Sequence, residues 1–226
     1  MQRRDFMKKQ VKIKTIMLAI FLVLGALAYR AYGQMPFYTK QADTSDDWNL
    51  ILVNREYAVP KDYSVALTTL SNGKQVDTRI YPALQQMFND ARAAGLSLFV
   101  REGYRTYDQQ KEIMENRIQT YEDQGVARWE AKKRAEALVA IPGTSEHELG
   151  LSVDINADTQ KCSSDAVYAW LHANAYKYGF IQRYPADKIN ITGINNEPWH
   201  YRYVGKQAAK EMKEKNLCLE EYLKKN

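Results

Sequence analysis

Apolar residues recur along the chain at spacings that predict both helices and strands. An amphipathic helix is predicted over residues 80–94, and it ends at Gly95. One face of this helix carries Ile80, Leu84, Met87, Phe88 and Ala91. The apolar run that follows, over residues 96–100, predicts a strand.

The remaining elements do not alternate regularly between helix and strand. Further strands are predicted over 50–53, 151–155, 180–181 and 200–204, and further helices over 106–122, 126–139, 164–178, 206–215 and 217–224. Ser164 or Asp165 caps the helix over 164–178, and Gly179 stops it. This order predicts an α+β fold with a small, mostly antiparallel sheet flanked by helices.

The N-terminal segment has the pattern of a targeting sequence. Residues 1–14 are basic, and an uncharged apolar run lies between Lys14 and Arg30. Because a membrane span needs about 20 residues, residues 15–32 fit either a signal peptide or an uncleaved membrane anchor. Basic residues before this run predict residues 1–14 in the cytoplasm and the rest outside. Arg3-Arg4 also resembles a twin-arginine export signal, although an ordinary basic region is the simpler interpretation.

The polar residues 33–47 predict a linker, and the folded domain is predicted over 48–226. The whole chain has a net charge of +5, whereas residues 1–33 alone have +6, so residues 34–226 sum to −1. The folded part therefore has no overall positive field for nucleic acid, and no nucleic-acid partner is expected. If the domain is exported, Cys162 and Cys218 can form a disulfide; the alternative is two separate buried thiols.

Two short polar segments contain residues that suit metal chemistry. His147 and Asp154 lie in the first segment, and Glu197 and His200 lie in the second. Two imidazoles and one carboxylate fill three positions of a tetrahedral zinc site and leave one for water. A further carboxylate beside that water can act as the general base of a hydrolase. Taken alone, the first segment is more typical of a surface loop histidine at His147 and a capping residue at Asp154; both segments in one chain favour a shared site.

The predicted secondary structure supports this convergence. In a strand over 151–155, Ser152 and Asp154 point to one face and the apolar Val153 and Ile155 to the other. Pro198 disfavours a helix interior, so Glu197 and His200 are expected on a loop or irregular strand, with Trp199 between them as a wall of the site.

Arg105 follows a strand and precedes a helix, where a side chain can reach a cleft. It could hold a substrate carboxylate or stabilise an oxyanion. Cys162 and His172 are not expected to bind zinc, because Cys162 lies beyond the strand end and His172 is expected to face solvent.

Three segments resemble VanY-type D-alanyl-D-alanine carboxypeptidases. They are Ser-x-His-x-x-Gly-x-x-x-Asp at 145–154, Glu-Pro-Trp-His-Tyr-Arg-Tyr at 197–203 and Gly-Tyr-Arg at 103–105. The similarity covers about residues 48–223 and implies a hedgehog-like D,D-peptidase fold with one Zn²⁺ per chain.

The resemblance also implies roles for individual residues. His147, Asp154 and His200 match the zinc ligands, Glu197 matches the base, and Arg105 matches the arginine that contacts substrate or transition state. Gln109, Ser145 and Ser152 fall where substrate-pocket residues are expected. Glu102 replaces a frequent serine and Glu148-Leu149 replace a common Gln-Thr pair, so the pocket polarity of this chain differs from the usual pattern.

The function that follows is an extracytoplasmic zinc carboxypeptidase, anchored or secreted to the cell wall. It is expected to remove the terminal D-alanine from peptidoglycan stem peptides. One alternative is an L,D-carboxypeptidase that acts on tetrapeptide stems, because its metal site would be the same. Another is a non-catalytic zinc-bearing binding module, against which the presence of Glu197 argues.

Overall fold

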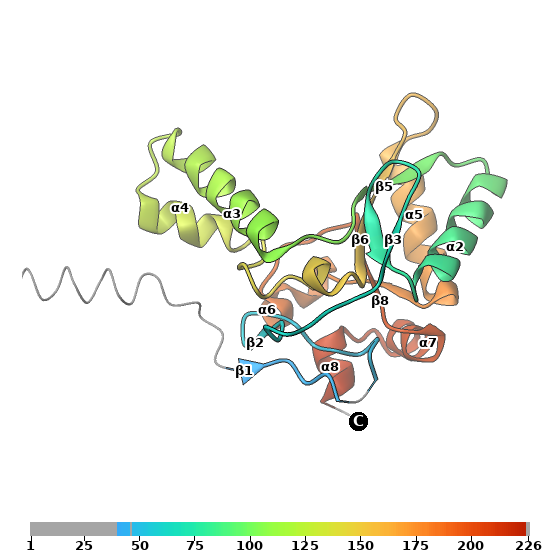
Figure 1. Ribbon diagram of the computed structural model, residues 1–226. Coiled ribbons are helices and arrows are strands. Elements are labelled where there is room, and N and C mark those ends of the chain that lie inside the picture. The colour runs from blue at the N-terminus through green and yellow to red at the C-terminus, as the bar shows by residue number, and fades with distance from the viewer. Residues whose placement is uncertain (1–39, 46, 225–226) are drawn as a thin grey trace, which may run out of the picture. The chain divides into compact units, whose positions relative to one another are not determined.

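The structure, a computed structural model, describes residues 40–45 and 47–224. Its centre is a four-stranded antiparallel sheet with the order β5-β6-β8-β7 (Figure 1). The strands are β5 (Leu98–Glu102), β6 (Ser152–Ala157), β7 (Phe180–Gln182) and β8 (His200–Tyr203). The predicted α+β class with an antiparallel sheet is therefore confirmed.

One face of this sheet packs against helices α2 (Tyr81–Ala93) and α5 (Ser164–Asn174). Both helices lie on the same side of the sheet in Figure 1. Val153 and Ile155 of β6 point to this side, as their alternation with polar neighbours predicted, and Tyr201 of β8 joins them in the main apolar cluster. Burial of this cluster fixes which face of each strand is turned inward.

The strand register brings polar residues together on the opposite face. Ser152 of β6 lies opposite Arg202 of β8, and Asp154 lies opposite His200. Directly opposed residues of an antiparallel pair have Cβ atoms about 4.5–5.5 Å apart. The pairing of β6 with β8 alone therefore places one carboxylate beside one imidazole.

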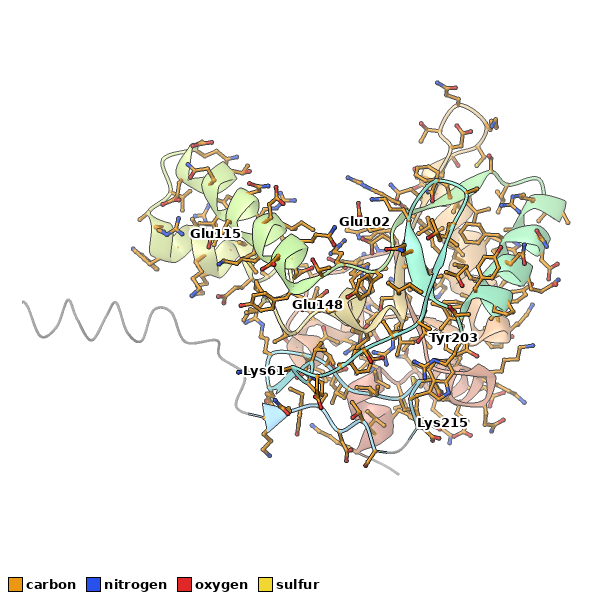
Figure 2. The ribbon with its side chains drawn as sticks, in the orientation of Figure 1. Lys61, Glu102, Glu115, Glu148, Tyr203 and Lys215 are labelled. Atoms are coloured by element: carbon orange, nitrogen blue, oxygen red, sulfur yellow. The ribbon has the colours of Figure 1, made fainter. Side chains whose placement is uncertain are left out.

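A helical hairpin extends from the end of β5. It consists of α3 (Tyr107–Glu122) and α4 (Arg128–Ala135), which lie side by side away from the sheet in Figure 1. Its two helices share a small apolar cluster of their own, made of Met114, Ile118, Ala131 and Ala135. Figure 2 shows Glu102, the last residue of β5, on the side of the strand that faces this hairpin.

Shorter elements complete the described part of the chain. They are β1 (Lys40–Gln41) paired in parallel with β2 (Tyr57–Ala58), the hairpin of β3 (Leu67–Thr69) and β4 (Gln75–Asp77), α6 (Ile189–Thr192), α7 (Lys206–Lys215), α8 (Leu219–Leu223) and the 3₁₀ helices η1 (Glu146–Leu149), η2 (Ala175–Tyr178) and η3 (Ala186–Lys188). The strand pairs β1–β2 and β3–β4 were not predicted, because their short runs lack a clear apolar period.

Three predicted elements differ from the structure. Residues 50–53 do not form a strand: Ile51 and Val53 are buried, but the Ile51 carbonyl accepts a hydrogen bond from the Arg202 guanidinium rather than from a neighbouring strand. The helix predicted over 126–139 stops at Ala135. The helix predicted over 164–178 changes to 3₁₀ geometry after Asn174.

The predicted disulfide is wrong in this structure. Cys162 and Cys218 are free thiols that make separate contacts. The Cys162 thiol donates a hydrogen bond to the Ser97 carbonyl, whereas Cys218 is buried at the start of α8. The second interpretation, two separate thiols, describes them.

The predicted cytoplasmic region, the signal peptide or anchor, and residues 33–39 and 46 of the predicted linker lie outside the residues that the structure describes. The described part of that linker belongs to the fold, because Lys40–Gln41 form β1 and Ala42 is buried in the main apolar cluster, so the predicted domain start at residue 48 is too late. Among residues 40–45 and 47–224, no helix has the length and hydropathy of a transmembrane span.

Candidate metal centre and active site

Three buried side chains from three different elements meet at one point. His147 comes from η1, Asp154 from the middle of β6, and His200 from the first position of β8. One ligand atom from each lies within 4.8 Å of the others. Asp154 Oδ1 is the common neighbour, at 3.4 Å from His147 Nε2 and 3.0 Å from His200 Nδ1. The three residues predicted as metal ligands thus come together.

The second nitrogen of each imidazole faces a buried oxygen. His147 Nδ1 lies 2.7 Å from the Gly103 carbonyl oxygen, which can only accept, so Nδ1 carries the hydrogen. His200 Nε2 lies 3.7 Å from Glu146 Oε2. The contact of His147 selects the tautomer that turns the lone pair of its Nε2 toward a metal. His147 Nε2 and His200 Nδ1 both face Asp154 Oδ1.

The unsatisfied atoms of this cluster fit a cation. Asp154 Oδ1 is buried and accepts no hydrogen bond from the described residues, and leaving such an oxygen unpaired is costly. Burial disfavours the ionised form of Asp154, yet His147 and His200 hold the pKa of this carboxyl well below its ordinary value. Two imidazole nitrogens and one carboxylate oxygen make a donor set typical of a zinc site with one position left for water.

Glu197 lies beside this cluster, with Oε2 at 3.6 Å from His200 Nδ1. Burial raises the pKa of Glu197 to about 7. Burial also disfavours the charged form of His200, but contacts with Asp154 and Glu146 outweigh it and raise the pKa of His200 to about 9. A carboxylate held next to the metal position, with a pKa near neutrality, can take up and return a proton.

A buried network of charged side chains supports the cluster from behind. Glu146 accepts hydrogen bonds from Arg183 Nε and Arg202 Nη1, both at 2.8 Å, and from Ser152 Oγ at 3.1 Å. Arg183 in turn binds both carboxylate oxygens of Glu220 on α8, at 2.9 and 2.7 Å. The network therefore links the C-terminal helix to the carboxylate that faces His200.

This network was not found from the sequence, although one signal was present. Arg202 lies two positions after His200 on a strand, so both side chains share a face. Burial penalises the ionised form of Glu146, but Arg183 and Arg202 hold the pKa of this carboxyl well below its ordinary value. Glu146 is therefore a carboxylate anion although it is fully buried.

Ser152 is not a pocket residue, and its predicted role in substrate binding is wrong. Its side chain is fully buried, and its hydroxyl donates to Glu146 behind the metal cluster. Ser145 does line the cavity, and its hydroxyl accepts a hydrogen bond from the His147 backbone nitrogen. Trp199 lines the cavity as predicted.

Arg105 reaches the cluster, whereas Gln109 does not. Arg105 Nη2 donates to Asp154 Oδ2 at 3.2 Å, and Nη1 donates to Gln110 Oε1 at 3.1 Å. The Gln109 side chain instead accepts from the Thr106 backbone nitrogen in a capping box, so its predicted contact with substrate is wrong. One residue along a helix rotates the side chain by about 100°, and this rotation makes Gln110 the glutamine of the site.

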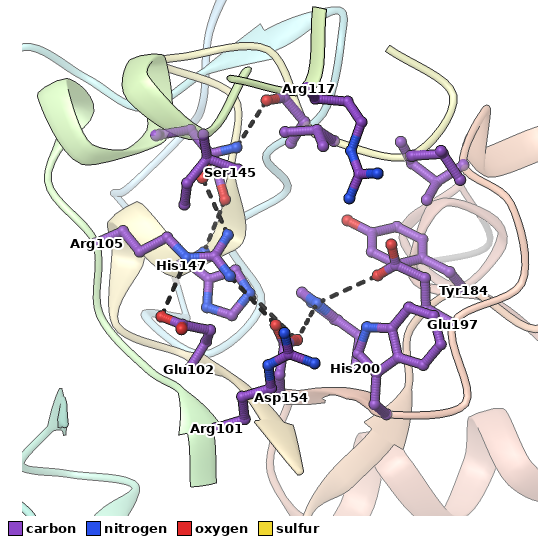
Figure 3. Close-up of a pocket in the computed structure, with 17 residues that line it drawn as sticks. Arg101, Glu102, Arg105, Arg117, Ser145, His147, Asp154, Tyr184, Glu197 and His200 are labelled. Atoms are coloured by element: carbon purple, nitrogen blue, oxygen red, sulfur yellow. Dashed lines mark hydrogen bonds and ion pairs between the residues drawn. The ribbon is translucent and has the colours of Figure 1, made fainter. Parts of the chain in front are cut away.

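A cavity of about 340 Å³ opens over the metal cluster (Figure 3). Several of its lining residues were not predicted, among them Arg101, Arg117 and Tyr184. Arg101 occupies a register shift in β5 between Val100 and Glu102, and such bulges re-aim side chains near active sites. In Figure 3, Arg117 points into the cavity from the side opposite His200.

Comparison with known proteins agrees with this geometry. The family model of VanY, D-alanyl-D-alanine carboxypeptidase, matches residues 73–206, which is more than half of the chain. The chain belongs to this family. VanY membership confirms the resemblance inferred from the three sequence segments.

Individual relatives of the VanY type are similar over most of the chain. A D-alanyl-D-alanine carboxypeptidase of Enterococcus faecalis is 52% identical over 184 residues, which cover 81% of this chain and 69% of the relative. The structure of VanYB in complex with D-alanine-D-alanine has a TM-score of 0.78 at 53% identity and covers 79% of this chain and 98% of that chain.

A second solved structure bears on the metal. It is a Glu-to-Ala mutant of the vancomycin resistance D,D-pentapeptidase VanY from a VanB-type resistance cassette, in complex with Zn(II). It has a TM-score of 0.77 at 53% identity and covers 78% of this chain and 99% of that chain. Together with the His-Asp-His cluster, the comparison identifies this VanY-family chain as a zinc metallopeptidase.

Proposed function

We propose that this protein is a zinc-dependent D,D-carboxypeptidase that removes the terminal D-alanine from peptidoglycan stem pentapeptides. The observation that carries the proposal is the His147–Asp154–His200 cluster with a buried carboxylate, Glu197, beside it. Similarity to D-alanyl-D-alanine carboxypeptidases supports the substrate class.

His147 Nε2, Asp154 Oδ1 and His200 Nδ1 would hold the metal, because these atoms converge and the oxygen has no hydrogen-bond donor among the described residues. When bound, zinc would polarise the scissile carbonyl and lower the pKa of a water molecule toward about 7. The Gly103 carbonyl keeps the His147 imidazole in the tautomer that this binding requires, and Glu146 faces the other ring nitrogen of His200.

Glu197 would move the proton of the reaction. It accepts a proton from the attacking water while the water oxygen bonds to the carbonyl carbon before the terminal D-alanine. It then gives this proton to the amine nitrogen as the carbon–nitrogen bond breaks, so water is consumed and free D-alanine leaves. Its burial keeps competing solvent away and places its pKa near 7.

Two arginines would bind the reacting end of the peptide. Arg105 Nε is buried and makes no hydrogen bond to the described residues, with Glu102 Oε2 at 3.8 Å, so it can donate to the carbonyl oxygen as negative charge develops there. Arg101, beside Glu102 at the β5 bulge, can pair with the free carboxylate of the terminal D-alanine.

The test combines metal analysis with D-alanine release. We expect one equivalent of zinc per chain and release of D-alanine from a pentapeptide stem, with little release from a tetrapeptide stem. A preference for the tetrapeptide would instead indicate the L,D-carboxypeptidase. Glu197→Ala should retain zinc and lose turnover, whereas Glu214→Ala, an exposed substitution on α7, should keep both. Turnover by the Glu197 variant would refute its role as base.

We also propose that the domain acts outside the cytoplasmic membrane. Support comes from the basic residues 1–14, which are followed by an uncharged apolar run between Lys14 and Arg30. A fusion of residues 1–47 to a reporter enzyme that is active only after export should be active. Loss of the apolar run should abolish this activity, and an inactive intact fusion would contradict the proposal.

A further inference from the structure

The cavity holds more positive charge than one peptide carboxylate requires. Three arginines line it: Arg101, Arg105 and Arg117. Arg105 is bound by Asp154 and Gln110. Within the described part of the chain, neither Arg101 nor Arg117 makes an ion pair or hydrogen bond. If Arg101 takes the terminal carboxylate of the proposed substrate, the guanidinium of Arg117 is left for another anion.

Arg117 lies on the face of α3 that borders the cavity. Gln110, Ile113 and Arg117 are spaced three and four residues apart, and all three line the cavity. Gln110 is the inner end of this row, because it contacts Arg105. At 1.5 Å per residue, the Cα atom of Arg117 lies about 10 Å farther along the helix axis. The row is therefore polar near the metal cluster, apolar in the middle and cationic at its outer end.

The acidic residues of the helical hairpin do not neutralise Arg117. Glu115 and Glu122 both pair with Arg128, each at 2.8 Å. Figure 3 shows the guanidinium of Arg117 turned into the cavity toward Tyr184. The Tyr184 ring lines the cavity beside this guanidinium. A guanidinium that points into a cavity without an anionic partner suits a carboxylate ligand.

We propose that Arg117 forms a second carboxylate subsite, which selects stem peptides with a free carboxylate upstream of the scissile bond. This inference rests on the proposed function and adds to it a specificity-determining residue. An extended peptide advances about 3.3 Å per residue, so the span from Gln110 to Arg117 corresponds to about three residues. Ile113 lies between Gln110 and Arg117 on the helix and can contact the methyl group of an alanine of the stem peptide. The γ-linked D-glutamate of a stem peptide, whose α-carboxylate is either free or amidated, lies at this distance.

The experiment compares two pentapeptide stems that differ only at that group, one with D-isoglutamate and one with D-isoglutamine. For the zinc-loaded native protein, we expect a KM about 3- to 10-fold lower for the acid, as for a solvent-accessible bidentate ion pair. Arg117→Gln should abolish this difference and leave kcat unchanged, because the contact is the same in ground and transition states. Arg117→Lys should keep part of it, since it retains the charge without the fork.

Arg134→Gln is the matched control. It removes one positive charge from the same helical hairpin, but Arg134 pairs with Glu130 on α4 and does not line the cavity. This variant should discriminate between the two stems as the native protein does. An equal loss in Arg134→Gln and Arg117→Gln would mean a general effect of charge and would overturn the subsite.

A binding measurement separates the subsite from the proposed reaction. Calorimetric titration of the zinc-loaded Glu197→Ala variant with each stem should show the same preference for the acid. A double variant that carries Glu197→Ala and Arg117→Gln should show no such preference. If the native protein releases no D-alanine from either stem, the proposed function fails while this titration still decides the subsite. Equal affinity for the two stems, or a preference that survives Arg117→Gln, would refute it.

Discussion

Replacing Glu146 by glutamine tests whether the buried network sustains the metal cluster. The substitution keeps the shape of the side chain and removes its negative charge. The glutamine oxygen can still accept from both arginines, but it no longer neutralises them. Arg202 is then left with neutral acceptors alone, such as the backbone carbonyls of Ile51 and Tyr203, and Glu220 is the one carboxylate that still pairs with Arg183 among the described residues. The new amide group also offers donors to neighbours that are themselves donors.

The expected cost follows from burial. Arg183, Arg202 and Glu146 are each at most 1% exposed, and removing one partner of such a buried ion pair typically costs about 3–5 kcal/mol. This loss is a large fraction of the unfolding free energy of a typical domain, which is roughly 5–15 kcal/mol. Because Glu146 also faces His200 Nε2, zinc affinity should fall by about 10- to 100-fold, as for other residues that orient a metal ligand.

Urea unfolding of the metal-free protein measures the first effect, and competition with a chromophoric chelator measures the second. Glu115→Gln is the control, because Glu115 forms an exposed ion pair with Arg128 on the outer part of the helical hairpin (Figure 2). Such pairs contribute about 0–1 kcal/mol. If Glu146→Gln costs no more than the control and leaves zinc affinity unchanged, the network has no role in stability or metal binding.

Three further predictions concern other parts of the site. Gln110→Ala should lower kcat/KM, because it removes an acceptor of Arg105. Gln109→Ala should mainly lower the unfolding free energy, by about 0.5–1.5 kcal/mol, because the helix cap is lost. Paired kinetic and urea assays check both, and a larger loss of kcat/KM in the Gln109 variant would contradict the structure. Burial penalises the ionised form of Glu220, but Arg183 lowers its pKa from 4.5, so its stabilising charge is present above pH 4.5 and lost as the pH falls below that value. The stability gap between the native protein and Glu220→Gln should therefore narrow in urea titrations from pH 6 to about 3, and a constant gap would count against it. Gly103→Ala should weaken zinc binding in the chelator assay. An added Cβ would collide with the backbone oxygen of Gln75 and displace the carbonyl that orients His147. Unaltered zinc affinity would show that the backbone can move here without disturbing His147.

Local patterns in the sequence predicted much of the fold and the metal ligands. The helical spacing of 80–94 and the alternation of 151–155 each depend on neighbouring residues alone, and both appear as expected in α2 and β6. His147, Asp154, Glu197 and His200 were predicted because the two segments together supply the imidazoles and carboxylates that a zinc ion and a general base require. These inferences use residue type and short-range period, which the sequence contains.

Contacts between distant segments decided what local patterns could not. The pairing of β6 with β8 sets Asp154 opposite His200, and it also turns Arg202 inward to Glu146, so an arginine becomes part of the core. Ile51 is buried without a strand, because the Arg202 side chain satisfies its carbonyl.

The finer assignment of pocket residues also needed the tertiary structure. A helix rotates by about 100° per residue, so the docking of α3 alone determined that Gln110 rather than Gln109 meets Arg105. The same docking brought Arg117, remote in sequence from every metal ligand, to the wall of the cavity. The sequence by itself thus determined which chemistry is present, through residue type and local period. Only the packing of distant segments decided which side chains surround it, because the orientation of a side chain depends on what its element is packed against.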